Sequence, residues 1–83
     1  MNDFDAQLAH QHEMHTIAMD ALRSVARTWR TPYPIIRDRF IGGDFPITAE
    51  FWRVVHARYP GRFAGVDWCH GCRKFNLYPR LLA

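Results

Sequence analysis

The sequence is poor in cysteine and lysine. Its only two cysteines, Cys69 and Cys72, lie two residues apart, and Lys74 is the single lysine among 83 residues. Two thiols at this spacing chelate a metal ion together, form one small disulfide, or remain as inert apolar side chains. No apolar run approaches the roughly 18 residues that span a bilayer, so we expect no membrane partner. The acidic start lacks the features of a secretory signal, so we expect a cytoplasmic, reducing setting that disfavours a permanent disulfide.

The usual signatures of catalysis are also missing. No pair of carboxylates is placed for acid–base chemistry, and Gly42-Gly43 lacks the lysine and hydroxyl residue of a phosphate-binding loop. The single serine, Ser24, falls inside a predicted helix and is a poor nucleophile there. We therefore expect a protein that is not an enzyme.

Positive charge is absent from the first 22 residues, which carry a net charge of −4. Residues 23–83 hold all eleven basic residues against four acidic ones, a net charge of +7. Ten of the eleven are arginine, whose planar guanidinium binds phosphates and carboxylates through two hydrogen bonds. The same arginine excess is expected of a protein from a GC-rich genome, so composition alone names no partner.

Length and composition predict one small domain over residues 1–83, mainly α-helical. The hydrophobic content of 48% and aromatic content of 14% indicate a folded chain. A core of this size is marginal without help, and such domains often add a metal, disulfides or a partner subunit. The sequence does not indicate an oligomeric state.

Three segments have the pattern of amphipathic helices. Apolar residues recur every three to four positions through 5–30, which predicts one long helix that ends before Pro32. A short helix is predicted at 34–41, and a third at 48–59 with Thr48 as its N-cap. The segment 63–83 is expected to hold a short strand or extended arm, a cysteine turn, and then either a helical turn or an extended tail.

The cysteine pair has the spacing of a zinc knuckle, and Gly71 permits the tight turn that lets both sulfurs face one ion. Structural zinc takes four Cys or His ligands, so two more are needed. His12 and His15 are three residues apart on the predicted long helix and share one side of it. We therefore predict a structural Zn²⁺ site made by Cys69, Cys72, His12 and His15, with His56 and His70 in reserve.

Two other interpretations of the cysteines stay open. Trp68-Cys69-His70-Gly71-Cys72 resembles the active-site stretch of thioredoxin-like oxidoreductases, which implies a thiol–disulfide oxidoreductase. The resemblance covers these five residues alone, and that family places most of its domain after the motif, whereas eleven residues follow Cys72 here. In the other interpretation the cysteines are buried and hold no ligand.

Binding is the function class that the basic residues favour. Segments 34–41 and 48–59 loosely resemble a helix-turn-helix, although the connection from Gly42 to Ile47 is longer than the usual three or four residues. We predict a small zinc-stabilised regulator that contacts nucleic acid through an arginine-rich surface. Its predicted contacts are Arg37, Arg39, Arg53, Arg58, Arg62, Arg73 and Lys74. The alternative is an accessory or phage-encoded regulator that binds a large protein complex directly.

Overall fold

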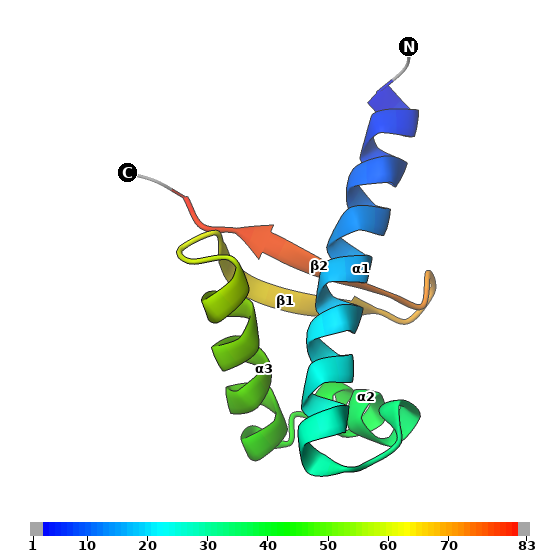
Figure 1. The fold of residues 1–83 in the computed structure, drawn as a ribbon. Helices are drawn as coiled ribbons and strands as arrows, with labels where there is room; N and C mark the ends of the chain where they lie inside the picture. Colours follow the sequence, from blue (N-terminus) through cyan, green and yellow to red (C-terminus); the bar gives the residue numbers. More distant parts are fainter. Residues whose placement is uncertain (1–2, 82–83) are drawn as a thin grey trace.

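Three helices precede a two-stranded antiparallel sheet in the computed structural model, which describes residues 3–81 (Figure 1). The elements are α1 (Asp3–Trp29), α2 (Tyr33–Ile41), α3 (Phe45–Arg58), β1 (Phe63–Cys69) and β2 (Lys74–Pro79). The prediction of a mainly α-helical fold with one long and two shorter helices is confirmed. None of the helices in this described part combines the length and the apolarity needed to cross a membrane.

The long helix α1 is buried only along its second half. Its buried residues begin at Met14, and the turns before Met14 extend past the rest of the fold (Figure 1). The helix ends where Arg30 adopts a left-handed conformation with φ of 52° and the Thr31 N–H donates to the Ala26 carbonyl. This is the hydrogen-bond pattern of a helix C-terminus that reverses direction. Pro32 then directs the chain into α2.

The helix α3 begins at Phe45, three residues before the predicted start at 48. Its N-cap is Asp44, whose carboxylate accepts a hydrogen bond from the Ile47 N–H at 3.4 Å. Thr48 lies inside the first turn, and its hydroxyl donates to the Phe45 carbonyl. The predicted N-cap was therefore wrong, because proline is tolerated in a first turn and Pro46 does not delay the helix. The connection from α2 shortens to residues 42–44.

The segment 63–83 forms a β-hairpin as far as the described residues reach. β2 pairs with β1 so that Trp68 lies opposite Phe75 and Val66 opposite Leu77. The helical turn offered as one option after residue 73 is wrong, because these residues alternate between buried and more exposed positions along a paired strand. The zinc-knuckle part of the predicted fold class stays a prediction, and the predicted tail at 82–83 lies outside the described residues.

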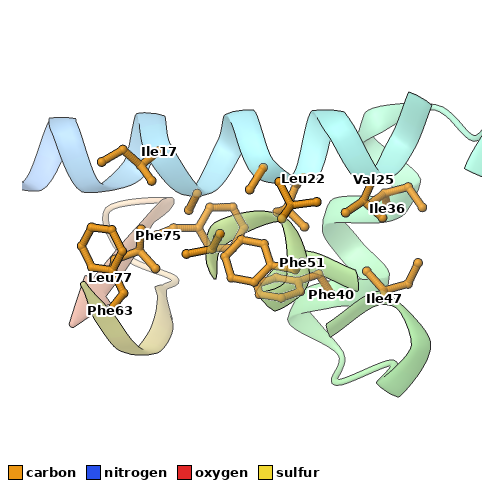
Figure 2. Close-up of a cluster of buried hydrophobic side chains, with 14 of the residues drawn as sticks. Ile17, Leu22, Val25, Ile36, Phe40, Ile47, Phe51, Phe63, Phe75 and Leu77 are labelled. Carbon is orange, nitrogen blue, oxygen red and sulfur yellow. The ribbon is translucent and has the colours of Figure 1, made fainter. Parts of the chain in front are cut away.

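The core joins the hairpin to all three helices (Figure 2). Phe75 of β2 and Phe51 of α3 are fully buried, and the Phe40 ring lies 5.7 Å and 4.5 Å from them, centroid to centroid. Leu22 of α1 closes the same cluster (Figure 2). Each such side chain contributes about 1.5–3 kcal/mol through burial. The core therefore fixes the position of the turn at residues 70–73 relative to α1 and α2.

Candidate functional site

The cysteine turn joins the two strands. Cys69 ends β1, and its sulfur lies 2.7 Å from the sulfur of Cys72. The backbone N–H of Cys72 also donates to the Cys69 sulfur, at 3.2 Å. Arg73 adopts a left-handed conformation with φ of 56°, and its N–H donates to the Cys69 carbonyl. The chain is therefore folded tightly around the Cys69 thiol.

These contacts separate the pKa values of the two thiols. Hydrogen bonds with the Cys72 thiol and with the backbone N–H groups of Cys72 and Gly71 lower the pKa of Cys69. The pKa of Cys72 is raised, chiefly by the hydrogen bond between its thiol and that of Cys69. Cys69 is therefore the more acidic thiol of the pair, and the thiolate is the form that binds metals and attacks disulfides.

The sulfur separation of 2.7 Å suits two kinds of chemistry. A disulfide bond is about 2.05 Å long, and two thiolates on a tetrahedral zinc ion lie about 3.8 Å apart, given Zn–S bonds of about 2.3 Å. A small side-chain movement leads from the observed arrangement of Cys69 and Cys72 to either state. The turn therefore holds two adjacent thiols, half the number of ligands that a structural zinc site takes.

The helix α1 passes beside this turn. The Gln11 side chain lies near the Cys72 thiol, and His15 reaches the start of β2. Nδ1 of His15 accepts a hydrogen bond from the Phe75 N–H at 3.0 Å, and the imidazole stacks on the Phe75 ring. A neutral imidazole that accepts at Nδ1 carries its proton on Nε2, and neither nitrogen then has a free lone pair for a metal. Burial, followed by Lys74 and His12, lowers the pKa of His15 and favours this neutral form.

Of the four predicted zinc ligands, the structure thus brings only the two cysteines together. Across residues 3–81, no group of three or more His, Cys, Asp or Glu side chains is arranged to hold a metal ion. Cys69 and Cys72 are adjacent, whereas His15 is held by β2 and His12 is exposed on α1. His56 stacks on Trp52 of α3, in a different part of the fold.

A hollow of about 350 Å³ lies between α2 and the cysteine turn. Its lining residues are Arg37, Asp38, Ile41, Trp68, His70 and Arg73. We call it the Arg37–Arg73 hollow. Trp68 is half-buried against Phe75, with ring centroids 4.7 Å apart, and His70 meets its edge. Two guanidinium groups, an indole, an imidazole and the Asp38 carboxylate, which is ion-paired with Arg37, therefore surround one hollow.

The basic surface continues from this hollow to the end of α1. The guanidinium of Arg37 lies 5.9 Å from the centre of the Tyr33 ring, and that of Arg23 lies 5.3 Å from it. Tyr33 and Arg23 also line a shallow depression with Arg27 and Arg30. Cations and aromatic rings therefore alternate along this surface, where Asp20 and Asp38 form ion pairs with Arg23 and Arg37. We call it the basic strip and define it as Arg23, Arg27, Arg30, Tyr33, Arg37, Trp68, His70 and Arg73.

Several of the predicted arginines are engaged within the chain, including Arg37, whose Nε donates to the Asp38 carboxylate at 3.0 Å. Arg39 donates to the Asp44 carboxylate at 3.0 Å and lies over Trp29. Arg53 forms an ion pair with Glu50, one turn earlier on α3. Arg62 lies over the rings of Tyr59 and Phe63 after α3.

The remaining predicted contacts lie in two places. Arg58 is exposed near the end of α3, and the half-buried Lys74 begins β2 beside His15. Of the predicted set, Arg37 and Arg73 meet at one hollow, while Arg53, Arg58 and Arg62 belong to α3 and the loop after it.

The predicted nucleic-acid contacts did not include His70, Tyr33 or the arginines of α1, and Trp68 was considered only as one of several aromatic residues on which bases could stack. The sequence signal available for Trp68 was the alternation of apolar side chains at Val66 and Trp68. This alternation places both residues on one face of a strand. The position of α2 relative to that strand depends on core contacts between distant residues. No protein-family model, curated protein or solved structure matches the chain.

Proposed function

We propose that this protein is a small, non-catalytic regulator that binds single-stranded nucleic acid through the basic strip. The observation that carries the proposal is the Arg37–Arg73 hollow, where two guanidinium groups flank Trp68. Proteins that bind unpaired strands combine cationic side chains for the phosphates with aromatic rings on which bases stack. Both elements of such a site occur together here, and Tyr33 repeats the arrangement beside Arg23.

The helices α2 and α3 support duplex recognition less well. Their three-residue connection, with Gly43 at φ of 85°, matches the length of a helix-turn-helix turn. The second helix of such a motif must offer side chains to base edges, however, and Arg53 is ion-paired with Glu50, as Arg37 is with Asp38. Phe45, at the start of α3, is 77% exposed and apolar. The Arg37–Arg73 hollow, in contrast, is lined by an indole ring together with two arginines. The basic strip is therefore the better candidate surface.

Zn²⁺ is the cofactor we propose for the cysteine turn, in a reducing, cytoplasmic setting. Cys69 is the readier thiolate of the pair, and backbone N–H groups of the turn stabilise its charge. Zinc bound at this turn would hold His70 and Arg73 at the edge of the Arg37–Arg73 hollow. The role is structural, because it sets the position of side chains that contact the ligand.

The test is fluorescence anisotropy with a labelled oligothymidine, the matching RNA and a duplex of the same length, over a series of salt concentrations. Single-strand binding releases about 0.7 counterions for each phosphate contacted. Contacts with three to five phosphates predict a slope of about −2 to −3.5 in a plot of log affinity against log salt. Tighter binding to the duplex, or binding that salt does not weaken, would contradict the proposal.

A second candidate function is direct binding to a large protein complex, and one observation favours it. Phe4 and Leu8 are 64% and 49% exposed on the part of α1 that extends past the fold (Figure 1). They line a shallow hollow of about 370 Å³ with Asn76 of β2. A helix end that is both apolar and acidic can bind in a groove on the surface of another protein. Such binding should be lost in Phe4→Ala with Leu8→Ala and be far less sensitive to salt than nucleic-acid binding.

A further inference from the structure

We propose that two copies of this chain share one zinc ion, each contributing Cys69 and Cys72 from its turn. The inference rests on the zinc proposed above and identifies the ligands that complete its coordination. Structural zinc takes four thiolate or imidazole ligands, and the turn supplies two thiols. A second identical turn supplies the other two and yields a four-cysteine site.

The chain's own residues do not complete the site in the observed arrangement. His15 gives Nδ1 to the Phe75 N–H, so ligation through that nitrogen would leave a strand N–H without its acceptor. The neighbour of Cys72 on α1 is Gln11, and a neutral amide is not among the usual zinc ligands. Within residues 3–81 no third Cys, His, Asp or Glu joins the pair in a metal-holding group.

The turn is placed where a second copy can reach it. It projects past α1 at the free end of the hairpin (Figure 1), and Cys72 is exposed while Cys69 is half-buried. A twofold axis through the ion would bring the same two thiols from each copy to the metal. A second copy can therefore reach the two thiols and supply the two zinc ligands that this chain does not.

Charge also favours this assembly. Four thiolates on one Zn²⁺ carry a net charge of −2, which repels further anions and needs nearby cations. Arg73 and Lys74 follow each Cys72 directly, so two copies place four positive side chains beside the centre. The negative charge of the zinc–thiolate centre would thus offset the repulsion between the Arg73 and Lys74 side chains of the two copies.

The shared ion would give the protein two binding surfaces in one particle. His70 and Arg73 belong to both the turn and the Arg37–Arg73 hollow, so each basic strip ends beside the metal. Two linked strips bind one strand with higher avidity than one strip does. Zinc would therefore control nucleic-acid affinity through dimerisation.

The experiment is performed on the full chain, purified with a thiol reductant. Zinc content is measured by elemental analysis, and particle mass by light scattering before and after addition of a chelator. Cobalt substitution reports the ligand set, because sulfur-to-cobalt charge-transfer absorption per ion increases with the number of thiolates. Cys72→Ser removes a proposed ligand, and His12→Ala is the matched control on the exposed side of α1. Circular dichroism of the chelated proteins checks that both variants remain helical.

Half a zinc ion per chain is expected, in a particle of twice the monomer mass that the chelator dissociates. The spectrum of four thiolates is expected with cobalt, and the dimer should be lost in Cys72→Ser and kept in His12→Ala. One zinc ion per monomer, lost in His12→Ala, would overturn the shared site while leaving the proposed zinc in place. Absence of zinc from the freshly reduced protein would overturn both.

Discussion

The backbone N–H of Phe75 donates a hydrogen bond to Nδ1 of His15, 3.0 Å away, between residues sixty positions apart in the chain. The two rings also stack, with centroids 5.8 Å apart. This contact gives the strand N–H an acceptor outside the sheet, where β2 would otherwise present an unpaired edge to α1. It attaches the hairpin, and with it the cysteine turn, to the long helix.

The stability of the protein should therefore depend on the protonation of His15. Burial lowers the pKa of His15 in the folded state below its ordinary value of 6.5. The unfolded chain then binds the proton more readily than the folded chain does. The stability that the neutral His15 contributes is therefore complete above about pH 6.5. It is lost as the pH falls through about 6.5 toward the lower pKa of the folded state. Urea unfolding at about pH 8 and about pH 5 should show a lower midpoint at the acidic pH.

His15→Asn provides the comparison for that measurement. An asparagine side chain has an oxygen that accepts a hydrogen bond at either pH, since it does not titrate in this range. The difference between the two midpoints should be smaller in His15→Asn than in the parent protein and unchanged in His10→Ala. An equal difference in all three proteins would show that His15 is not the group responsible.

The N-cap of α3 gives a second prediction. Asp44→Ala should lower the free energy of unfolding by about 1–2 kcal/mol, because the Ile47 N–H loses its acceptor. Asp44→Asn keeps an acceptor and loses the ion pair with Arg39, so its cost should be below about 1 kcal/mol. Thr48→Ala is the control, with an expected change within about 0.5 kcal/mol. A larger loss in Thr48→Ala than in Asp44→Ala would restore the cap predicted from sequence.

These capping contacts show where sequence reasoning succeeded and where it did not. Apolar periodicity predicted all three helices, because a spacing of three to four residues places side chains on one buried face. The start of α3 was misplaced because Asp44 and Thr48 are both good caps, and the choice depends on how α2 ends at Gly42. Local sequence does not decide between them.

The hairpin and the binding surface depended on contacts between distant residues. Phe75 and Leu77 alternate as strand residues do, yet Pro79 and the short segment left a helical turn equally open. Which arginines are occupied by neighbouring carboxylates, as Arg53 is by Glu50, also depends on side-chain geometry. Composition predicted a basic surface and did not distinguish its free cations from its paired ones.

The core contact of the hairpin gives a third prediction. Phe75 is fully buried and touches the rings of Phe40, Trp68 and His15. Phe75→Ala should cost about 3–5 kcal/mol of unfolding free energy, through lost burial and the cavity left behind. Tyr78→Ala, on the exposed side of β2, should cost far less. Chemical denaturation of both variants tests this, and similar losses would contradict the placement of the hairpin on the core.

The central claim is that nucleic acid binds at the basic strip rather than to positive charge in general. Two double variants with the same charge change test it most directly: Arg37→Gln with Arg73→Gln in the strip, and Arg53→Gln with Arg58→Gln on α3. Anisotropy with a labelled oligothymidine should show at least about tenfold weaker binding for the strip variant and a salt slope smaller by about 1.4. The α3 variant should bind within about threefold of the parent protein. Equal losses in the two variants, or no loss in the strip variant, would contradict the claim.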